Sequence, residues 1–478
     1  MTGILLDAVH VLTWIVLGYF VLLNAGYLIT SMLAFGALRR HARRMKLFYV
    51  EEFLSAENVP TVTLIAPAYN EEATCVPATT ALLAQQYPRY EVFVVNDGSK
   101  DRTLAVMIEA FDLEEIPRAP SASLPCARVK AVYRSRRRPN LYVLDKENGG
   151  KADALNAGLN YCRGELFCAL DADTLLERDA LARVVRPFLE DRTLVAAGGI
   201  IRIANDVVVK GGVVTEVRLP KRLLPQLQVV EYLRAFLSGR MGWDALNATL
   251  IISGAFGLFQ RAAVVEAGGY RKDTVGEDME LVVRLHRYCR DNRIPYRVGF
   301  VPDPVAWTEA PESLRVLGRQ RDRWQRGLLQ VLWMHRGMLF RPRYGRIGMV
   351  AYPYFLFLEG LGPIIEVGGY IAFAIQLLLV GWSPLFALAF FGVAIGLGMA
   401  ISIAAVGLEE MSLRRYERPR DLFGLFGLAV IEPLGYRQLS TWWRLKGVVS
   451  AIRGVHAWGE MERRGFSPQA ATAEKKEP

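Results

Sequence analysis

The stretch ELFCALDAD (165–173) places a run of apolar residues directly before two aspartates, Asp171 and Asp173. A short apolar run that ends in polar residues is typical of a buried β-strand. A buried carboxylate is costly unless a partner compensates its charge. The stretch therefore predicts an interior strand whose far end presents acidic side chains to a charged ligand.

Three further apolar runs predict strands of the same kind: VTLIAPAY (62–69), YEVFVVND (90–97) and LYVLD (141–145). Segments with helical periodicity separate them, namely CVPATTALLAQQ (75–86) and KADALNAGLNYC (151–162). Apolar strands that alternate with helices indicate an α/β fold, in which helices cover both faces of a parallel sheet. Residues 111–140 interrupt this alternation, and we expect them to form a surface insertion or flexible loop.

The carboxyl ends of these strands carry polar residues, and ligands of open α/β sheets bind in the crevice beyond such ends. Two carboxylates two residues apart point to one face of a strand and suit a hard divalent cation such as Mg²⁺ or Mn²⁺. Such a cation would bridge a nucleotide diphosphate and stabilise the charge that develops on it as it leaves. The strand-end residues are Tyr69, Glu71, Asp97, Asp171 and Asp173.

Two other phosphate-binding patterns are absent from the sequence. No G-x-G-x-x-G follows the first predicted strand, which excludes the usual dinucleotide site. Ala152 stands where a P-loop needs a hydroxyl residue. Lys151, after two glycines at a predicted helix start, is nevertheless placed to meet an anion.

Each charged group also has an ordinary structural interpretation. Asp171 and Asp173 could cap a turn, residues 96–99 have favourable turn chemistry, and Lys151 could be a solvated lysine. Glu277 and Asp278 could simply favour a helix N-terminus. GRQRDRWQRG (318–327) could be a basic helix that lies on anionic lipid.

The composition indicates membrane segments joined to a globular domain, because 52% of the 478 residues are hydrophobic while 22% are charged. Residues 4–38 are long and apolar enough for one span, and residues 347–407 for two spans with a break near 381–384. Residues 421–443 could form a fourth span or re-enter from the cytoplasmic side. Arg437 within them makes a lipid-facing span costly unless it faces a polar conduit.

The distribution of charge predicts the orientation of the chain. Basic clusters flank the predicted spans and place residues 40–345 in the cytoplasm of a multi-pass inner (plasma) membrane protein. The net charge of +10 does not indicate nucleic-acid binding, because the basic residues lie at membrane edges. The five cysteines and five histidines lack metal-ligand spacing, so neither disulfides nor a zinc site is expected.

Seven motifs occur along the chain in a fixed order. They are APAYNEE (66–72), VVNDGSKD (94–101), NGGKADALNAGL (148–159), LDADT (170–174), ISGAFGLFQR (252–261), GEDMEL (276–281) and QRDRW (320–324). In this order they resemble the processive, membrane-integrated glycosyltransferases of family 2, which include cellulose, chitin, hyaluronan and poly-N-acetylglucosamine synthases. The resemblance implies a GT-A (Rossmann-like) fold and an inverting hexosyl transfer from a nucleotide-diphosphate sugar, usually a UDP-sugar, with UDP-N-acetylglucosamine as one candidate.

The resemblance also implies a role for each motif residue. Asp278 would take the proton from the acceptor hydroxyl, and Asp173 would hold the metal ion, Mg²⁺ or Mn²⁺. The nucleotide-sugar would be bound by Tyr69, Glu71, Asp97, Lys151, Asp171, Gln320 and Arg323. The acceptor would be bound by Ser253, Gly254, Glu277 and Trp324. Aromatic faces bind sugar rings well, which suits a tryptophan at the acceptor.

The predicted product is a growing polysaccharide that is exported across the membrane, with export or accessory proteins as candidate partners. Two alternatives remain: a single-addition transferase that acts on a lipid acceptor, and a silent nucleotide-sugar-binding scaffold. We expect a membrane helix and basic flank (1–45), a cytoplasmic GT-A domain (46–313), a Q-x-x-R-W segment with an interfacial helix (314–345), two spans (346–410), and a re-entrant or fourth membrane segment with a tail (411–478).

Overall fold

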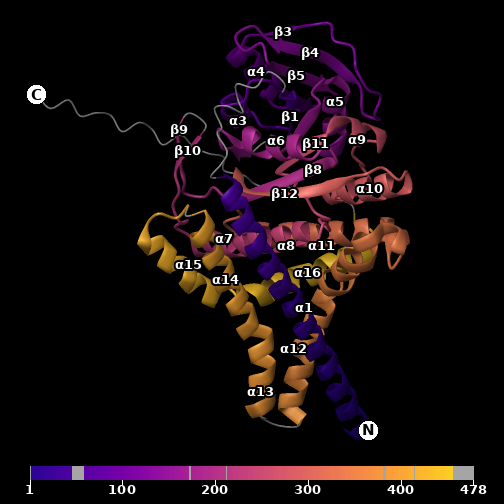
Figure 1. Ribbon diagram of the computed structural model, residues 1–478, viewed down its shortest axis with the longest axis vertical. Helices are drawn as coiled ribbons and strands as arrows, with labels where there is room; N and C mark the ends of the chain where they lie inside the picture. The colour runs from indigo at the N-terminus through magenta and orange to yellow at the C-terminus, as the bar shows by residue number, and fades with distance from the viewer. Residues whose placement is uncertain are drawn as a thin grey trace, which may run out of the picture.

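The computed structural model describes residues 2–45, 59–171, 174–210, 213–379, 384–413 and 415–455. Figure 1 shows three tiers: a sheet with its helices at one end, a layer of helices lying crosswise beneath it, and long apolar helices that project from the other side. The first helix, α1 (Thr2–Met45), runs from the far tip of the projecting helices up to the sheet.

The main sheet has ten strands in the order β3-β4-β5-β2-β1-β6-β11-β8-β12-β7. Its central strands β5, β2, β1 and β6 are parallel, which confirms the predicted α/β architecture. In spatial order the strands are β3 (Leu113–Glu115), β4 (Val129–Ser135), β5 (Leu141–Lys146), β2 (Tyr90–Asp97), β1 (Val62–Ala68), β6 (Leu166–Leu170), β11 (Phe256–Gln260), β8 (Leu194–Ile203), β12 (Arg297–Thr308) and β7 (Leu175–Leu176).

Helices cover both faces of this sheet because successive strand residues point to opposite sides. Leu64 of β1 belongs to one apolar cluster, while Ile65 belongs to the other. Helices α3 (Cys75–Leu82), α4 (Thr103–Phe111) and α6 (Ala180–Glu190) contribute to the first cluster. The second cluster includes residues of α5 (Lys151–Tyr161), α9 (Arg261–Glu266) and α10 (Glu277–Asp291).

Two expectations from the sequence need correction. Strand β6 ends at Leu170 rather than at residue 173, and Asp173 lies outside the described residues. Residues 111–140 are not a flexible loop, since they contain β3 and β4 and are anchored to α5. The amide group of Asn160 binds the backbone N–H and the carbonyl of Leu124, and Asn156 donates to the carbonyl of Pro125.

The middle tier consists of helices that lie across the molecule (Figure 1). The π-helical segment η1 continues helix α7, and such segments are frequent at functional sites. These elements are α7 (Leu223–Tyr232), η1 (Leu233–Arg240), α8 (Met241–Ala245), α11 (Leu314–Met334), α15 (Pro419–Ile431) and α16 (Tyr436–Ile452). A two-stranded ribbon of β9 (Val208–Lys210) and β10 (Val213–Glu216) lies at one side.

Among the described residues, two helices are long and apolar enough to cross a membrane, Val11–Arg43 and Gly392–Ser412. A third candidate is the pair Ile347–Gly360 and Gly362–Leu378, which is bent by 42°. The predicted break near 381–384 falls largely outside the described residues. Residues 421–443 are divided between α15 and α16, and within the described chain neither helix is a candidate span.

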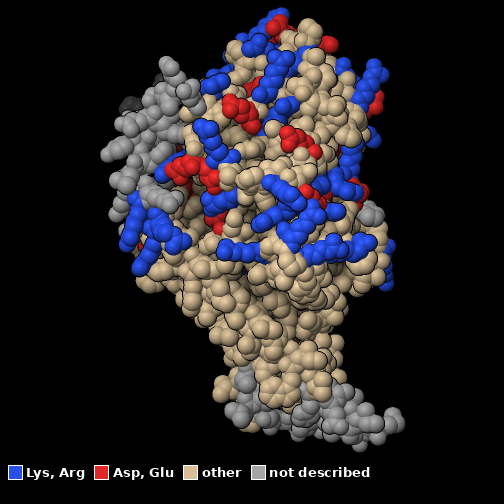
Figure 2. Space-filling model, turned by 45° about the vertical axis from the view of Figure 1, so that its right-hand side comes forward, with Lys and Arg blue, Asp and Glu red and all other residues tan. Residues whose placement is uncertain are grey.

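The charged side chains mark the border between these tiers. Figure 2 shows lysines and arginines gathered over the sheet tier and in a band at its lower rim, with few charges on the narrow part below. This distribution fits a protein whose projecting helices lie in a membrane and whose sheet lies in water.

Candidate active site

The candidate site lies at the edge of the sheet where the parallel strands end. Strand β11 runs antiparallel to β6, with Phe256 opposite Leu170. The residues just before β11 therefore lie beside those just after β6. In this way the sheet topology brings Ser253 and Gly254 to the edge from which Asp171 emerges.

A cluster of charged groups meets at this edge. Lys151 Nζ, on the first residue of α5, lies 2.5 Å from Asp171 Oδ1 and 3.4 Å from Glu277 Oε1. The backbone N–H of Gly254 donates to Asp278 Oδ2 at 2.8 Å. A Cβ atom on Gly254 would lie 3.0 Å from Lys151 Nζ, so the close approach favours glycine. Segments that are distant in sequence thus converge on one small volume.

Burial and charge act against each other in this cluster. Burial disfavours the charged form of Lys151, but Asp171 and Glu277 raise the pKa of its ammonium group above the ordinary value. Burial also raises the pKa of the Glu277 carboxyl; Lys151 offsets part of that rise, whereas Asp278 adds to it. Lys151 is therefore held as a cation, ready to face an anionic ligand.

Helix α11 reaches this cluster because two glycines allow it to cross the start of α10. A Cβ atom on Gly276 would lie 3.2 Å from the Cα of Gly327, so the two backbones are in direct contact. Gln330 of α11 also accepts the backbone N–H of Val275 at 3.1 Å. The crossing places Trp324, one turn before Gly327, next to the cavity that Asp278 lines.

Widening this crossing should damage catalysis. We expect Gly327→Val to lower kcat/KM about tenfold or more, because small displacements of positioned groups are costly. Gly337→Ala is the matched control, since a Cβ atom there would meet nothing within 4 Å. Both variants are compared by steady-state turnover. Equal activity of the two variants would show that the crossing of α10 and α11 does not position the residues of the site.

Asp97 lies at the end of β2 and is only 3% exposed. Its carboxylate accepts the backbone N–H groups of Gly149 at 3.1 Å and Gly150 at 2.8 Å, and it forms an ion pair with Lys146. Lys146 is 0% exposed and also lies 2.6 Å from Asp153. Asp97 thus anchors the loop that precedes Lys151, and its predicted contact with the nucleotide stays a prediction.

Lys146 and Asp153 were not predicted from the sequence. Lys146 follows the apolar run LYVLD directly, and that position is the one sign of its burial. Burial opposes the charge of Asp153, but hydrogen bonds from Lys146 and Lys272 hold the pKa of this carboxyl below its ordinary value. The network fixes the glycine loop through buried ionic contacts.

Removing the buried cation should destabilise the protein strongly. Lys146→Met leaves two buried carboxylates without their shared partner, which typically costs about 3–5 kcal/mol. Lys272→Met is the matched control, because Lys272 also pairs with Asp153 but is about half exposed. Thermal unfolding in detergent should show a much larger fall in Tm for Lys146→Met. A similar Tm for both variants would contradict the structural role of Lys146.

Tyr69 and Glu71 belong to the loop after β1, which is attached to the loop after β2. Asn70 N–H donates to Ser99 Oγ at 3.0 Å, and Glu71 N–H donates to Thr103 Oγ1 at 2.8 Å. Tyr69 is exposed. Tyr69, Glu71 and Asp97 lie at the ends of the neighbouring strands β1 and β2. None of these three residues lines the cavity that begins at the charged cluster.

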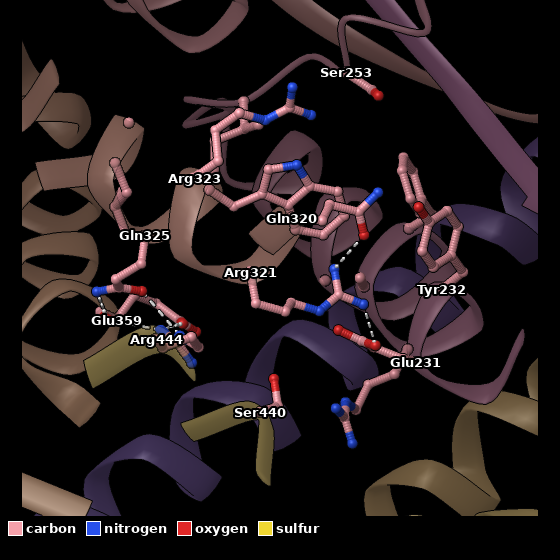
Figure 3. A pocket seen from close by; sticks show the side chains of 18 of the residues that line it. Glu231, Tyr232, Ser253, Gln320, Arg321, Arg323, Gln325, Glu359, Ser440 and Arg444 are labelled. Carbon is pink, nitrogen blue, oxygen red and sulfur yellow. Dashed lines mark hydrogen bonds and ion pairs between the residues drawn. The ribbon is translucent and has the colours of Figure 1, made fainter. Parts of the chain in front are cut away.

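A cavity of about 670 Å³ runs from the charged cluster into the projecting helices. Its upper part is lined by Lys151, Asp171, Ser253, Gly254, Glu277, Asp278, Gln320, Arg323 and Trp324. Its lower part is lined by Tyr19, Glu366 and Tyr370 of the projecting helices and by Arg437 of α16. Figure 3 shows the region between them, where Ser253 and Arg323 lie at one end and Ser440 and Arg444 at the other.

Ion pairs and hydrogen bonds line the lower part of this cavity. Arg444 lies 3.0 Å from Glu359 and donates to Gln325 at 2.9 Å (Figure 3). Thr441 donates to Glu366 at 2.7 Å. Arg437 lines the same cavity, and whether residues 421–443 re-enter the membrane stays a prediction. Glu359 and Glu366 come from the projecting helices, so polar pairs link these helices to α16 along the cavity.

The π-helical region also belongs to this wall. Glu231 and Tyr232 of α7 and Arg234 and Phe236 of η1 line the cavity. Arg234 pairs with Glu432 at 2.9 Å. The sequence predicts the segment 205–250 as an interface helix or part of the acceptor channel, but not the pair of Arg234 with Glu432, which joins helices that are far apart in the chain.

The described residues at the sheet edge supply some, but not all, of the ligands that a divalent cation would need. Among the described residues no group of three or more His, Cys, Asp or Glu could hold a metal ion. Asp171 contributes a carboxylate at the strand end, and Asp173, two residues on, lies outside the described ranges. A donor set of carboxylates beside a bound diphosphate suits Mg²⁺ or Mn²⁺, which take oxygen ligands from both.

Comparison with known proteins identifies the family of this chain and two of its relatives. The family described as "Glycosyltransferase like family 2" matches residues 60–327. The chain is 27% identical over 280 residues to the poly-beta-1,6-N-acetyl-D-glucosamine synthase of Staphylococcus aureus (strain COL). The matched region covers 58% of this chain and 57% of that protein. The synthase of the same name from Staphylococcus epidermidis is 26% identical over 277 residues, covering 58% and 56%. The chain thus spans little more than half the length of these relatives.

A solved structure shares the fold. The mannosyltransferase PcManGT from Pyrobaculum calidifontis, in complex with GDP-Man and Mn²⁺, aligns with a TM-score of 0.50 at 20% identity. The alignment covers 90% of this chain and 99% of that chain. The predicted GT-A fold is confirmed by this likeness together with the family match.

Proposed function

This chain belongs to the glycosyltransferase-like family 2, and we propose that it is an inverting, processive enzyme that extends a polysaccharide from a UDP-sugar and exports it. That it is a glycosyltransferase follows from the family. The sugar, the acceptor and export belong to the proposal. One observation carries it: a single cavity joins the charged cluster at the sheet edge to the polar interior of the projecting helices.

The chemistry of the proposal follows from the groups that share the upper cavity. Asp278 would accept the proton of the acceptor hydroxyl, because general bases are carboxylates or imidazoles positioned beside the reacting group. Lys151 would face the diphosphate and stabilise its charge as the sugar leaves. Trp324 would stack against the acceptor sugar, and Ser253 and Gly254 would line its pocket.

The other motif residues complete the assignment. Gln320 and Arg323, on the face of α11 that lines the cavity, would close over the diphosphate. Glu277 would contact the acceptor beside Asp278. Tyr69, Glu71 and Asp97 would hold or frame the nucleotide at the ends of β1 and β2. Asp171 and Asp173 would hold the diphosphate and a divalent cation, which supplies charge stabilisation when bound.

The relatives guide the choice of donor. The staphylococcal proteins are named poly-beta-1,6-N-acetyl-D-glucosamine synthases, so UDP-N-acetylglucosamine is the first donor to test. The mannosyltransferase with the same fold was solved with GDP-Man and Mn²⁺, so Mn²⁺ is the first cation to test.

The proposed location is the inner (plasma) membrane, with the sheet tier in the cytoplasm. The candidate spans and the band of basic residues at the lower rim of the sheet tier support this orientation. The domain boundaries predicted from the sequence are also part of the proposal.

The deciding experiment uses the purified chain in nanodiscs with Mn²⁺ and a panel of UDP-sugars. Release of UDP from one sugar, together with a long polymer, supports the proposal. Release that stops after one sugar per acceptor molecule would overturn processivity and favour a single-addition transferase with a lipid acceptor. Release from none of the UDP-sugars would overturn the donor assignment.

A further inference from the structure

Arg321 lies inside the QRDRW motif but has no role in the proposed chemistry. Arg321 lines the cavity, and the residue is 2% exposed. Nη2 lies 2.6 Å from Glu231 Oε2, and Nη1 donates to Gln320 Oε1 at 3.4 Å. Figure 3 shows the guanidinium between Gln320 and Glu231. The same Glu231 oxygen also accepts the hydroxyl of Tyr436 at 2.6 Å.

The guanidinium also stacks on the tryptophan of the same motif. Its Cζ atom lies 4.3 Å from the centre of the Trp324 ring. Guanidinium planes bind aromatic faces by stacking and by cation–π attraction. One face of Trp324 is therefore covered, while the residue as a whole remains 44% exposed and lines the cavity.

A buried arginine of this kind must be held by its partner, because an unpaired buried charge is very costly. Glu231 belongs to α7 and Tyr436 to α16, so the guanidinium is fixed from two helices other than its own. A fixed guanidinium in turn restrains the plane of the ring that it covers. The contact to Gln320 is long for a hydrogen bond, so the main effect falls on Trp324.

We propose that Arg321, clamped by Glu231, is a positioning residue that sets the ring plane of Trp324 and leaves its open face for the acceptor sugar. This inference rests on the proposed function, since it assumes that Trp324 meets the acceptor. It adds that the acceptor platform is tied, through Glu231 and Tyr436, to helices that line the cavity. A lysine could keep the ion pair but not the planar stack.

The test separates the acceptor from the donor. Arg321→Met and Arg321→Lys are assayed with UDP-N-acetylglucosamine, Mn²⁺ and a short oligomer of N-acetylglucosamine. We expect kcat/KM for the oligomer to fall about 100-fold in both variants, because the platform is misplaced. Hydrolysis of the donor without acceptor, and UDP binding, should stay at wild-type levels. Arg315→Met, on the exposed first turn of α11, is the matched control.

A double-variant cycle shows whether Arg321 acts through Trp324. Arg321→Met added to Trp324→Ala should cause no further loss, because the group it positions is already gone. Additive losses, or an unchanged oligomer KM in Arg321→Met, would overturn the inference while the proposed function stands. Loss of donor hydrolysis and UDP binding would also overturn it, in favour of a general structural role. A wild-type chain that releases no UDP would overturn both.

Discussion

Asp278→Asn is expected to lower kcat about a thousandfold, since a positioned general base typically contributes about 10²–10⁴-fold. The side chain sits at the start of α10, where Oδ2 accepts the N–H of Gly254 at 2.8 Å and Oδ1 accepts the N–H of Met279 at 2.7 Å. Asparagine has the same shape and keeps one acceptor oxygen, so the local fold should survive. Single-turnover transfer and UDP binding by calorimetry measure the two effects separately.

Binding of UDP should be nearly unchanged in this variant, because the proposed role of Asp278 concerns the acceptor hydroxyl. Asp273→Asn is the matched control: this exposed aspartate pairs with Arg271 in the loop before α10. Turnover near the wild-type rate in Asp278→Asn would show that another group takes the proton. Glu277→Gln would then be the next variant, since Glu277 lies in the same cluster.

The central strands could be predicted from the sequence because each is buried on both faces. Such strands are continuous apolar runs, and β2 begins and ends at the predicted residues 90 and 97. β3 and β4 could not be predicted, since their residues are only partly buried and their pairing depends on β5, with β4 beside β5 and β3 beside β4. The end of β6 was placed too late, because the strand ends at Leu170 and Asp171 already lies beyond it.

The upper part of the site could also be predicted, because strand ends and short motifs are local features. Lys151, Asp171, Glu277 and Asp278 come from separate segments, and the sheet order explains why they meet. The buried partners could not be predicted. A lysine at the end of a strand and an arginine inside a basic helix look solvated until the fold supplies Asp153 or Glu231.

The individual pairs that line the lower cavity could not be predicted, because hydropathy does not report which face of a helix meets another. Its wall is made by α1, η5 (Tyr354–Gly360), α12 (Gly362–Leu379) and α16. Tyr27 of α1 donates to Glu359 at 2.6 Å, and Tyr19 donates to Glu366 at 3.0 Å. Such pairs lower the cost of polar groups at membrane depth, and they make the lower cavity testable as an exit path.

Ser440→Trp is therefore expected to stop chain growth after a few additions while the first transfer continues. Ser440 lines the cavity below the site and points into it in Figure 3. An indole would bury about 150–250 Å² in that space, enough to obstruct a sugar chain. Ile452→Trp is the matched control, because Ile452 lies on the same helix but is exposed and outside the cavity lining.

The readouts are product length on a sizing column and transfer of one labelled sugar to a short acceptor. Short products with intact first transfer would mean that the growing chain must enter the lower cavity, since an obstruction remote from Asp278 limits length and not chemistry. Loss of both would point to a displaced α16, which packs along α11. Full-length polymer from Ser440→Trp would mean that the product leaves by another route, and the polar lining would then need a different explanation.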